Sequence, residues 1–278
     1  MKKYIIGFIL VLMLITPLYA ANGFSITIGE ATNNNAAYKS SMLSYFQSKT
    51  DKNIDDAQIK VITASEVNDI SKNVTGLVYP SNKIFSCALV DLSYNEGVKV
   101  VVDKSKVRVV TPQMYANALQ SSGIDRGYVV VSSPVPASGE AALAGVLKSY
   151  ELAVGTPIPE EAKKASTEEL YLQTQLVNQT GQSGDNIAQL FSDVKNQTQQ
   201  KNLQNPEQIK VIVINVASQM NINLSDNQVQ QIADSLANSQ KVKANLTDFQ
   251  NELQNISQNV SSSNILDQIT SFIQGLFN

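Results

Sequence analysis

The chain has 278 residues, with 21 basic and 24 acidic side chains, one cysteine and no histidine or tryptophan. The lack of histidine excludes the Ser-His-Asp and Cys-His routes to an activated nucleophile and the common zinc hydrolase sites. Lysine and arginine form no cluster that would bind nucleic acid electrostatically. We therefore expect no nucleic-acid partner, no metal and no cofactor, and carboxylates are the general acid or base groups in best supply.

Residues 1–20 have the pattern of a secretory signal peptide. Two lysines precede an apolar stretch at 5–15, and small residues follow at Ala20 and Ala21. The apolar stretch is shorter than the ~20 residues of a membrane-spanning helix. We expect cleavage after Ala20, with Ala21 as the alternative and an uncleaved anchor as the less favoured outcome. The mature chain would carry 19 basic and 24 acidic residues, a net charge of −5. It would be secreted or held at the cell surface and would not be an integral membrane protein.

The single cysteine, Cys87, cannot form an internal disulfide. It lies in the apolar run IFSCALV, which favours a buried small hydrophobic side chain over a reactive thiol. An exported chain without disulfides must be stabilised by its core, and about 258 residues bury a sizeable one.

Composition changes once along the mature chain. From residue 22 to 155, apolar runs typical of strands alternate with helical stretches, whereas the sequence beyond Pro157 has helical periodicity and many Asn and Gln residues. Two prolines in the segment 155–159 would end a helix. We therefore predict an α/β domain at 22–155 and a helical, Asn/Gln-rich domain at 158–278.

Five strands and four helices are expected in the first part. The strands are predicted at 24–28, 58–63, 83–91, 98–103 and 127–132, and the helices at 35–48, 64–71, 112–122 and 139–153. The short connection LSYNEG between the third and fourth strands predicts a hairpin and thus at least one antiparallel pair. Thr111 and Pro112 mark a helix start, and Gly123 is its C-terminal cap. The pattern after it, a strand at 127 and a helix at 139, suggests a βαβ-like unit. These patterns predict a mixed sheet with packed helices.

The second part is expected to hold four to six helices. Asn205 and Ser225 are each a polar cap with Gln three residues later, the spacing of a capping box. The segment 209–217 (IKVIVINVA) is rich in β-branched residues, but the preceding cap and the apolar Met220 beyond it favour a helix.

A helical apolar stripe ends the sequence, formed by Ile265, Leu266, Ile269, Phe272, Ile273, Leu276 and Phe277. Residues 261–278 contain no Lys or Arg, which membrane-surface helices usually place on their polar face. Packing against the preceding helices is therefore favoured. Contact with a partner helix, including self-association through the helical extension, and contact with lipid are the alternatives.

Two short motifs of serine enzymes occur without the third that accompanies them. Ser192 and Lys195 match S-x-x-K, and the segment 225–227 matches S-D-N, but K-T-G is missing. Ser225 is already explained as a helix cap. We therefore interpret both matches as parts of helices.

Acidic side chains occur in two patterns that imitate functional sites. The segment from Asp51 resembles the start of a calcium loop, but it lacks the Gly and Glu required at the sixth and twelfth positions and is interpreted as a turn. The pairs at 160–161 and 168–169 are placed near helix starts, where negative charge complements the helix dipole.

Residues 129–143 read as strand, loop and helix, an order that can bind phosphate. Ser138 is a natural N-cap for a helix that begins at Gly139, and the free amides there can hold an anion. The loop is neither a Walker motif nor a dinucleotide fingerprint, and Pro134 and Pro136 remove two amides. A structural turn is favoured, with Ser138 and Gly139 as a candidate anion- or ligand-binding site.

Seven N-x-S/T sequons are candidate N-glycosylation sites in an exported chain. They begin at Asn73, Asn178, Asn196, Asn223, Asn245, Asn255 and Asn259. Six of the seven fall in the helical part.

The most specific block of sequence is PQMYANAL at 112–119 followed by GIDRGYVVVSSPVPASGEAALAGVLKSYE at 123–151. Together with ITIGEA at 26–31, GLVYPSNKIFSCALVDL at 76–92 and EEAKKASTEEL at 160–170, it resembles the YpuA-like family of secreted bacterial and archaeal proteins of unknown function. The resemblance covers most of the chain from Phe24 to about residue 240. It implies a signal peptide and an extracytoplasmic location, and it supplies no catalytic residues.

We favour a secreted or cell-envelope-associated, non-enzymatic protein that binds an envelope component or a protein partner. The α/β domain would supply the recognition surface, with exposed tyrosines such as Tyr79, Tyr94, Tyr115 and Tyr128. The alternative is a carboxylate-based hydrolase of envelope polymers. That enzyme would require two carboxylates within about 10 Å in a cleft, at least one of them desolvated.

Overall fold

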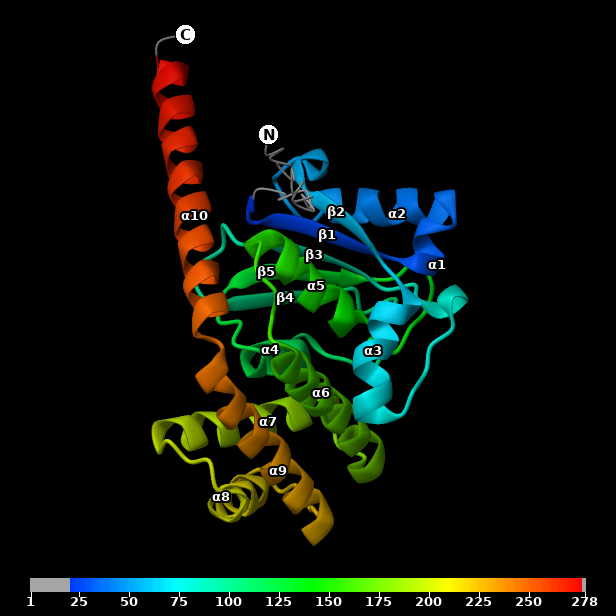
Figure 1. Cartoon of the computed structure of the whole chain (residues 1–278), viewed down its shortest axis with the longest axis vertical. Helices are drawn as coiled ribbons and strands as arrows, with labels where there is room; N and C mark the ends of the chain where they lie inside the picture. The colour runs from blue at the N-terminus through cyan, green and yellow to red at the C-terminus, as the bar shows by residue number, and fades with distance from the viewer. Residues whose placement is uncertain (1–20, 277–278) are drawn as a thin grey trace, which may run out of the picture.

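Five strands form one mixed sheet in the middle of the protein (Figure 1). The computed structural model describes the backbone of residues 21–276 and the side chains of residues 21–243 and 245–262. The strands are β1 (Phe24–Gly29), β2 (Gln58–Ile62), β3 (Cys87–Asp91), β4 (Val98–Val102) and β5 (Gly127–Ser132), in the order β2-β1-β3-β5-β4. β2 and β4 are parallel to their neighbours β1 and β5, whereas β3 is antiparallel to both β1 and β5. The predicted α/β class with a mixed sheet is confirmed.

The helices of the described chain precede, connect and follow these strands. They are α1 (Glu30–Asn33), α2 (Ala36–Gln47), α3 (Ala64–Thr75), α4 (Pro112–Ser121), α5 (Ala142–Val154), α6 (Glu160–Thr180), α7 (Gly184–Gln200), α8 (Pro206–Gln219), α9 (Asp226–Val242) and α10 (Thr247–Leu276). Short 3-10 turns lie at Ile54–Asp56, Ser81–Lys83 and Lys243–Asn245. The helices beyond Pro157 confirm the predicted helical extension.

The caps predicted from the sequence mostly form. Ser225 makes a complete capping box with Gln228, whereas Asn205 caps α8 through the amide of Glu207 and makes no box. The β-branched segment 209–217 is helical, as predicted, because the Asn205 cap starts the helix and one of its faces is buried, while Val211 and Ile214 are exposed.

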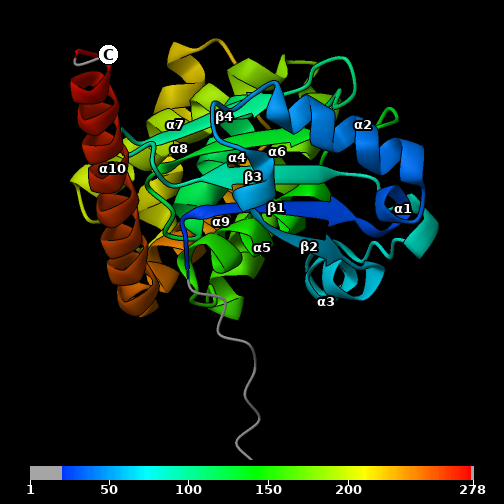
Figure 2. The ribbon, with the colours of Figure 1, turned by 90° about the horizontal axis from the view of Figure 1, so that it is seen from above.

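The two faces of the sheet bury different side chains, because successive residues of a strand point to opposite sides. On one face, Ile28 and Leu89 form a small core with Phe46 of α2. On the other face, Val129 and Val131 join the main core beneath α4 and α5. Figure 1 shows α2 on one side of the sheet and α4 to α9 on the other, and Figure 2 looks down on α2 lying over the strands.

Gly145 lets α5 approach β1 closely. A Cβ at this position would lie 3.1 Å from Thr27 Oγ1, which instead donates a hydrogen bond to the Gly145 carbonyl at 3.0 Å. Ser25 Oγ donates in the same way to the Ser149 carbonyl at 2.7 Å. These contacts fix α5 and therefore the loop that leads into it.

The main hydrophobic core continues from the sheet into the helices beyond Pro157. It includes Leu147 of α5, Leu170 of α6 and Phe191 of α7. Gly155, with φ 76° in the left-handed region, ends α5 before α6 begins, so the helix break lies in the predicted joint at 155–159. The parts before and after the joint share one core, and their division into domains at 22–155 and 158–278 stays a prediction.

Three local predictions are wrong. β3 and β4 form no hairpin, because β5 lies between them. The strand expected at 83–91 begins only at Cys87, because the carbonyl of Ile84 accepts the amide of Ala31 at the start of α1. The helix expected from Gly139 begins at Ala142, because Gly139 has φ 109°.

The first half of α10 packs on the main core, at the side of the molecule away from α3 (Figures 1 and 2). Phe249 and Leu253 are buried, and Ser257 Oγ donates to the Leu92 carbonyl at 2.8 Å. The side chains of the stripe predicted from Ile265 onward lie outside the described residues, as does the predicted signal peptide. Within residues 21–276, no helix combines the length and apolar character needed to cross a membrane.

Leu253→Ala removes a fully buried side chain from the contact between α10 and the core. We expect the free energy of unfolding to fall by about 2–5 kcal/mol, the range for buried Leu→Ala changes. Gln254→Ala, at the neighbouring exposed position, should change it by less than about 0.5 kcal/mol. Urea denaturation followed by circular dichroism measures both values, and equal effects would show that α10 does not contribute to the core.

Candidate functional site

Three adjoining cavities lie along α6 and form a groove bounded by α3, α5, α6 and α9, which we call the α3–α6 groove. We call them the β2-side, central and α9-side cavities, in their order along α6. The β2-side cavity shares Ile70 and Ala144 with the central cavity. The central cavity shares Thr75 and Tyr171 with the α9-side cavity. Counting the space open to solvent, their volumes are about 520, 370 and 750 Å³ in that order. Figure 1 shows α3 and α6 side by side at this surface.

Five of the α6 side chains that line the groove are spaced three or four residues apart, so they lie on one face of the helix. They are Glu160, Lys163, Thr167, Tyr171 and Gln175. At a rise of 1.5 Å per residue, this face is about 22 Å long.

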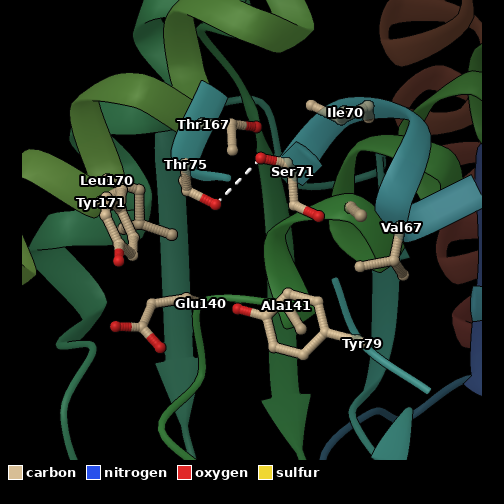
Figure 3. A pocket seen from close by; sticks show the side chains of 11 residues that line it. Val67, Ile70, Ser71, Thr75, Tyr79, Glu140, Ala141, Thr167, Leu170 and Tyr171 are labelled. Atoms are coloured by element: carbon tan, nitrogen blue, oxygen red, sulfur yellow. Dashed lines mark hydrogen bonds between the residues drawn. The ribbon is translucent and has the colours of Figure 1, made fainter. Parts of the chain in front are cut away.

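The central cavity has an apolar base and two tyrosines (Figure 3). Val67 of α3 and Leu170 of α6 are buried in its lining, whereas Tyr79 and Tyr171 are half-buried. The two tyrosine hydroxyls have no hydrogen-bond partner among the described residues. Burial, with smaller contributions from Glu140 and Tyr171, raises the pKa of Tyr79 to about 12. Its phenol therefore keeps its proton at neutral pH and can donate a hydrogen bond.

The loop at 76–80 is fixed by α3 and still exposes apolar side chains. Asn68 Nδ2 donates to the Tyr79 carbonyl at 2.9 Å, and the Tyr79 amide donates to Asn68 Oδ1 at 2.7 Å. Leu77 and Val78 are nevertheless 39% and 62% exposed. Single exposed apolar residues are ordinary, but an adjacent pair held beside a cavity indicates a contact surface.

Seven carboxylates line the groove, and they fall into two classes. Three are paired with lysines, in the pairs Glu66–Lys60, Glu151–Lys148, Glu151–Lys163 and Glu160–Lys163. Four form no ion pair among the described residues, namely Asp69, Glu140, Glu168 and Asp234. Each cavity has at least one of these four, so the groove is negatively charged along its length.

Glu151 and Glu160 lie close together because both contact Lys163 Nζ, at 2.8 and 2.7 Å. Glu151 is 9% exposed. Burial alone would raise the pKa of Glu151, but the hydrogen bonds and charges of Lys148 and Lys163 outweigh burial and hold that pKa below its usual value. A general acid needs a raised pKa, so this pair is suited to fixing α5 against α6 and poorly suited to acid–base chemistry.

A separate polar network is buried between α4, α6 and α7. Glu169 is 0% and Lys195 is 3% exposed, and Lys195 Nζ lies 2.7 Å from Glu169 Oε1. Ser121 Oγ donates to Glu169 Oε2 at 2.5 Å, and Lys195 also donates to the Asn117 carbonyl. Burial raises the pKa of Glu169 and lowers that of Lys195, while their mutual attraction opposes both shifts. The network has no access to solvent and joins three helices.

This network corrects one interpretation of the sequence and agrees with another. The acidic pair at 168–169 does not lie near a helix start, because α6 begins at Glu160 and Glu169 is a buried residue in its middle. Lys195 of the S-x-x-K match contacts Glu169 and forms no hydrogen bond to Ser192 among the described residues. The match therefore has no catalytic geometry there.

The candidate site at Ser138 and Gly139 differs from its prediction. Ser138 is exposed but caps no helix, and its hydroxyl donates to Glu140 Oε2 at 2.5 Å. Gly139 is buried, and its carbonyl accepts the Tyr115 hydroxyl at 2.5 Å. The N-cap of α5 is Ala141, which makes no side-chain cap. The helix start on which anion binding depended is therefore absent at Gly139, and a carboxylate lies beside Ser138 instead.

The four tyrosines proposed for a binding surface are divided by the fold. Tyr115 is fully buried, so its predicted exposure is wrong. Tyr94 and Tyr128 are half-buried on the α2 side of the sheet, with Lys99 Nζ 5.7 Å from each ring centroid. Only Tyr79 of the four lines the α3–α6 groove.

Two other sequence expectations concern exposure. Cys87 is 1% exposed, and burial raises the pKa of its thiol to about 11, which confirms a buried and unreactive side chain. All seven sequon asparagines, Asn73, Asn178, Asn196, Asn223, Asn245, Asn255 and Asn259, are exposed. Their glycosylation stays a prediction.

Comparison with known proteins identifies relatives. A family model described as "Protein of unknown function (DUF1002)" matches residues 28–256. The uncharacterized protein YpuA of Bacillus subtilis (strain 168) is 29% identical over 189 residues, which cover 67% of this chain and 63% of the relative. The match thus spans less than two thirds of that relative. No solved structure matches the chain.

Glu151→Gln tests the ion pairs at the β2 end of the groove. Because the folded pKa of Glu151 lies below its unfolded value near ~4.3, the carboxylate stabilises the fold above that value and loses this effect as the pH falls through the folded pKa. We expect the variant to be less stable than the parent by about 1–3 kcal/mol at pH 7. The difference should shrink as the pH falls below the unfolded value and through the folded pKa of Glu151.

Urea titrations across this pH range measure the effect, with Glu161→Gln at an exposed position of the neighbouring helix α6 as control. A deficit that does not change with pH would show that the carboxylate charge of Glu151 is not its source.

Lys195→Met tests the buried network. It leaves the Glu169 carboxylate without its cation, and we expect a loss of about 3–5 kcal/mol in unfolding free energy. The double variant Glu169→Leu/Lys195→Met removes both charges and should recover most of that loss. Thermal and urea denaturation of the single and double variants measure the coupling, and simple additivity would contradict a buried ion pair.

Proposed function

The chain belongs to the family of proteins of unknown function described as DUF1002, and we propose that it is an exported protein that binds a component of the cell envelope in the α3–α6 groove. The observation that carries this proposal is the central cavity. There the hydroxyls of Tyr79 and Tyr171 have no hydrogen-bond partner in the part of the chain that the structure describes, and the loop that carries Tyr79 also exposes Leu77 and Val78. Tyrosines that present an apolar ring and a free hydroxyl are typical of contact surfaces.

Export is supported by the pattern of residues 1–20 and by the exposed sequons. The mature protein would act at the cell surface or in the surrounding medium. Its charge of −5 leaves no general attraction to nucleic acid.

Binding without catalysis is supported by the charges in the groove. Glu151, the buried carboxylate of the groove, is held ionised by Lys148 and Lys163. The carboxylates without cations, such as Glu168 and Asp234, are exposed and hydrated. A carboxylate-based hydrolase needs one desolvated acid that carries a proton.

The proposed recognition surface draws on both parts of the chain. α3 and α5 come from the segment before the joint at 155–159, and α6 and α9 come from the segment after it. The binding module is therefore the folded chain as a whole, and removal of residues 160–278 would remove half of the groove.

Tyr171→Ser tests the proposal by truncating the side chain that lines both the central and the α9-side cavity. We expect the mature protein to sediment with isolated cell envelope and the variant to be retained about tenfold less, the effect of losing one central aromatic contact. Tyr94→Ser, at a half-buried tyrosine outside the groove, should be retained like the parent.

Circular dichroism and thermal melting confirm that each variant is folded before the comparison. Equal retention of the Tyr171 and Tyr94 variants would rule out the groove as the binding site. If the parent releases soluble fragments from the envelope, the binding hypothesis is wrong and the hydrolase hypothesis is supported.

A further inference from the structure

We propose that the ligand of the α3–α6 groove is an extended polypeptide segment with Lys or Arg side chains on either side of an apolar residue. This inference rests on the proposed function and adds the chemical class of the ligand. It follows from the length of the groove, the sign and position of its unpaired charges, and the apolar character of its centre.

The length of the groove favours an extended chain. Its lining on α6 runs from Glu160 to Gln175, about 22 Å along the helix. An extended peptide advances about 3.3 Å per residue, so about seven residues cover this distance. The three cavities are open to solvent and adjoin one another, which suits successive side chains of one chain better than a single compact molecule.

The unpaired charges lie toward both ends of the groove and beside its centre. Asp69 lines the β2-side cavity, Glu140 the central cavity, and Glu168 and Asp234 the α9-side cavity. Within the described part of the chain these carboxylates contact neutral groups: Ser138 donates to Glu140 at 2.5 Å. Amide side chains donate to Asp234 at 3.0 Å and to Glu168 at 3.4 Å. Cationic side chains of a ligand would form ion pairs with these carboxylates, whereas an anionic ligand would be repelled by four negative charges.

The centre of the groove requires an apolar group between those cations. Val67, Ile70 and Leu170 line the centre, and the half-buried Tyr171 lies at its edge (Figure 3). A ligand with cations alone, such as a polyamine, would leave this apolar lining in contact with water. A metal ion is not favoured either, because the described residues contain no group of three or more His, Cys, Asp or Glu that could hold one.

The test uses a fluorescein-labelled heptapeptide of alternating lysine and leucine and measures fluorescence anisotropy with the full mature protein. The quadruple variant Asp69→Asn/Glu140→Gln/Glu168→Gln/Asp234→Asn removes the unpaired charges. We expect its affinity to fall at least about tenfold, and the parent's affinity to fall with added salt. The matched control, Asp51→Asn/Glu96→Gln/Glu207→Gln/Asp248→Asn, changes the net charge equally at exposed positions outside the groove. It should bind within about twofold of the parent.

Two further peptides separate the parts of the inference. The same sequence with glutamate in place of lysine, and the same sequence with serine in place of leucine, should both bind at least about tenfold more weakly. Equal binding of the glutamate peptide, or equal effects of the two quadruple variants, overturns the cationic ligand. Equal binding of the serine peptide overturns the apolar centre and favours a polyamine.

The outcome is separable from that of the proposed function. If envelope retention depends on Tyr171 but the lysine–leucine peptide does not bind, the groove is a binding site for another class of ligand. If retention is independent of Tyr171 and the peptide does not bind, both proposals fail. If the peptide binds through the groove while retention is independent of Tyr171, the peptide assignment holds and the envelope target is wrong.

Discussion

The rotation of α6 about its own axis is the constraint on which both the core and the groove depend. Successive residues of a helix are about 100° apart, so residues two positions apart lie on nearly opposite sides. Glu169 lies two positions from both Thr167 and Tyr171, and it is buried against Lys195 while they line the groove. The buried ion pair thus holds Tyr171 toward the groove. A turn of α6 by one residue in the direction that buries Glu168 would take Glu169 away from Lys195.

The buried ion pair has a high desolvation cost, so its role is unlike that of ordinary apolar packing. Removing Glu169 and Lys195 from water costs several kcal/mol per ion, and apolar residues of similar size often stabilise a core equally well. Apolar side chains, however, tolerate small rotations of a helix, whereas Glu169 must meet Lys195 at 2.7 Å and Ser121 at 2.5 Å together. The pair therefore adds orientational specificity to packing that Leu170 and Phe191 already provide.

Local sequence patterns predicted most helices and strands. The features that they did not predict depend on contacts between residues far apart in the sequence. Caps at Thr111 and Ser225 identified helices, and the apolar runs of β1 and β5 identified strands, to within a few residues. The order of the strands was not available from any local pattern, since β5 separates β3 from β4 only after α4 has folded back. The prediction that a helix begins at Gly139, with Ser138 as its N-cap, was wrong. The hydroxyl of a distant residue, Tyr115, donates to the Gly139 carbonyl and holds this loop outside the helix.

The buried network was missed although its signal is in the sequence. Ile187, Phe191, Val194 and Thr198 form the buried face of α7, and Lys195 occurs within that spacing. A lysine on an apolar face indicates a buried partner. The identity of that partner depends on the packing of α6 against α7, so Glu169 could not be chosen over Glu168. The groove had no comparable signal, because its lining comes from α3, α5, α6 and α9, which the tertiary structure brings together.

The division of the groove carboxylates into paired and unpaired sets connects stability to binding. Glu66, Glu151 and Glu160 meet lysines at the β2 end, where they hold α3, α5 and α6 in place. Asp69, Glu140, Glu168 and Asp234 contribute no such ion pair and repel one another, which opposes folding. Lysines meet Glu151, but among the described residues none pairs with Glu140, so its charge is unbalanced at the wall of the central cavity. Local conflicts of this kind are characteristic of functional sites, and a cationic ligand would resolve this one by supplying the missing charge.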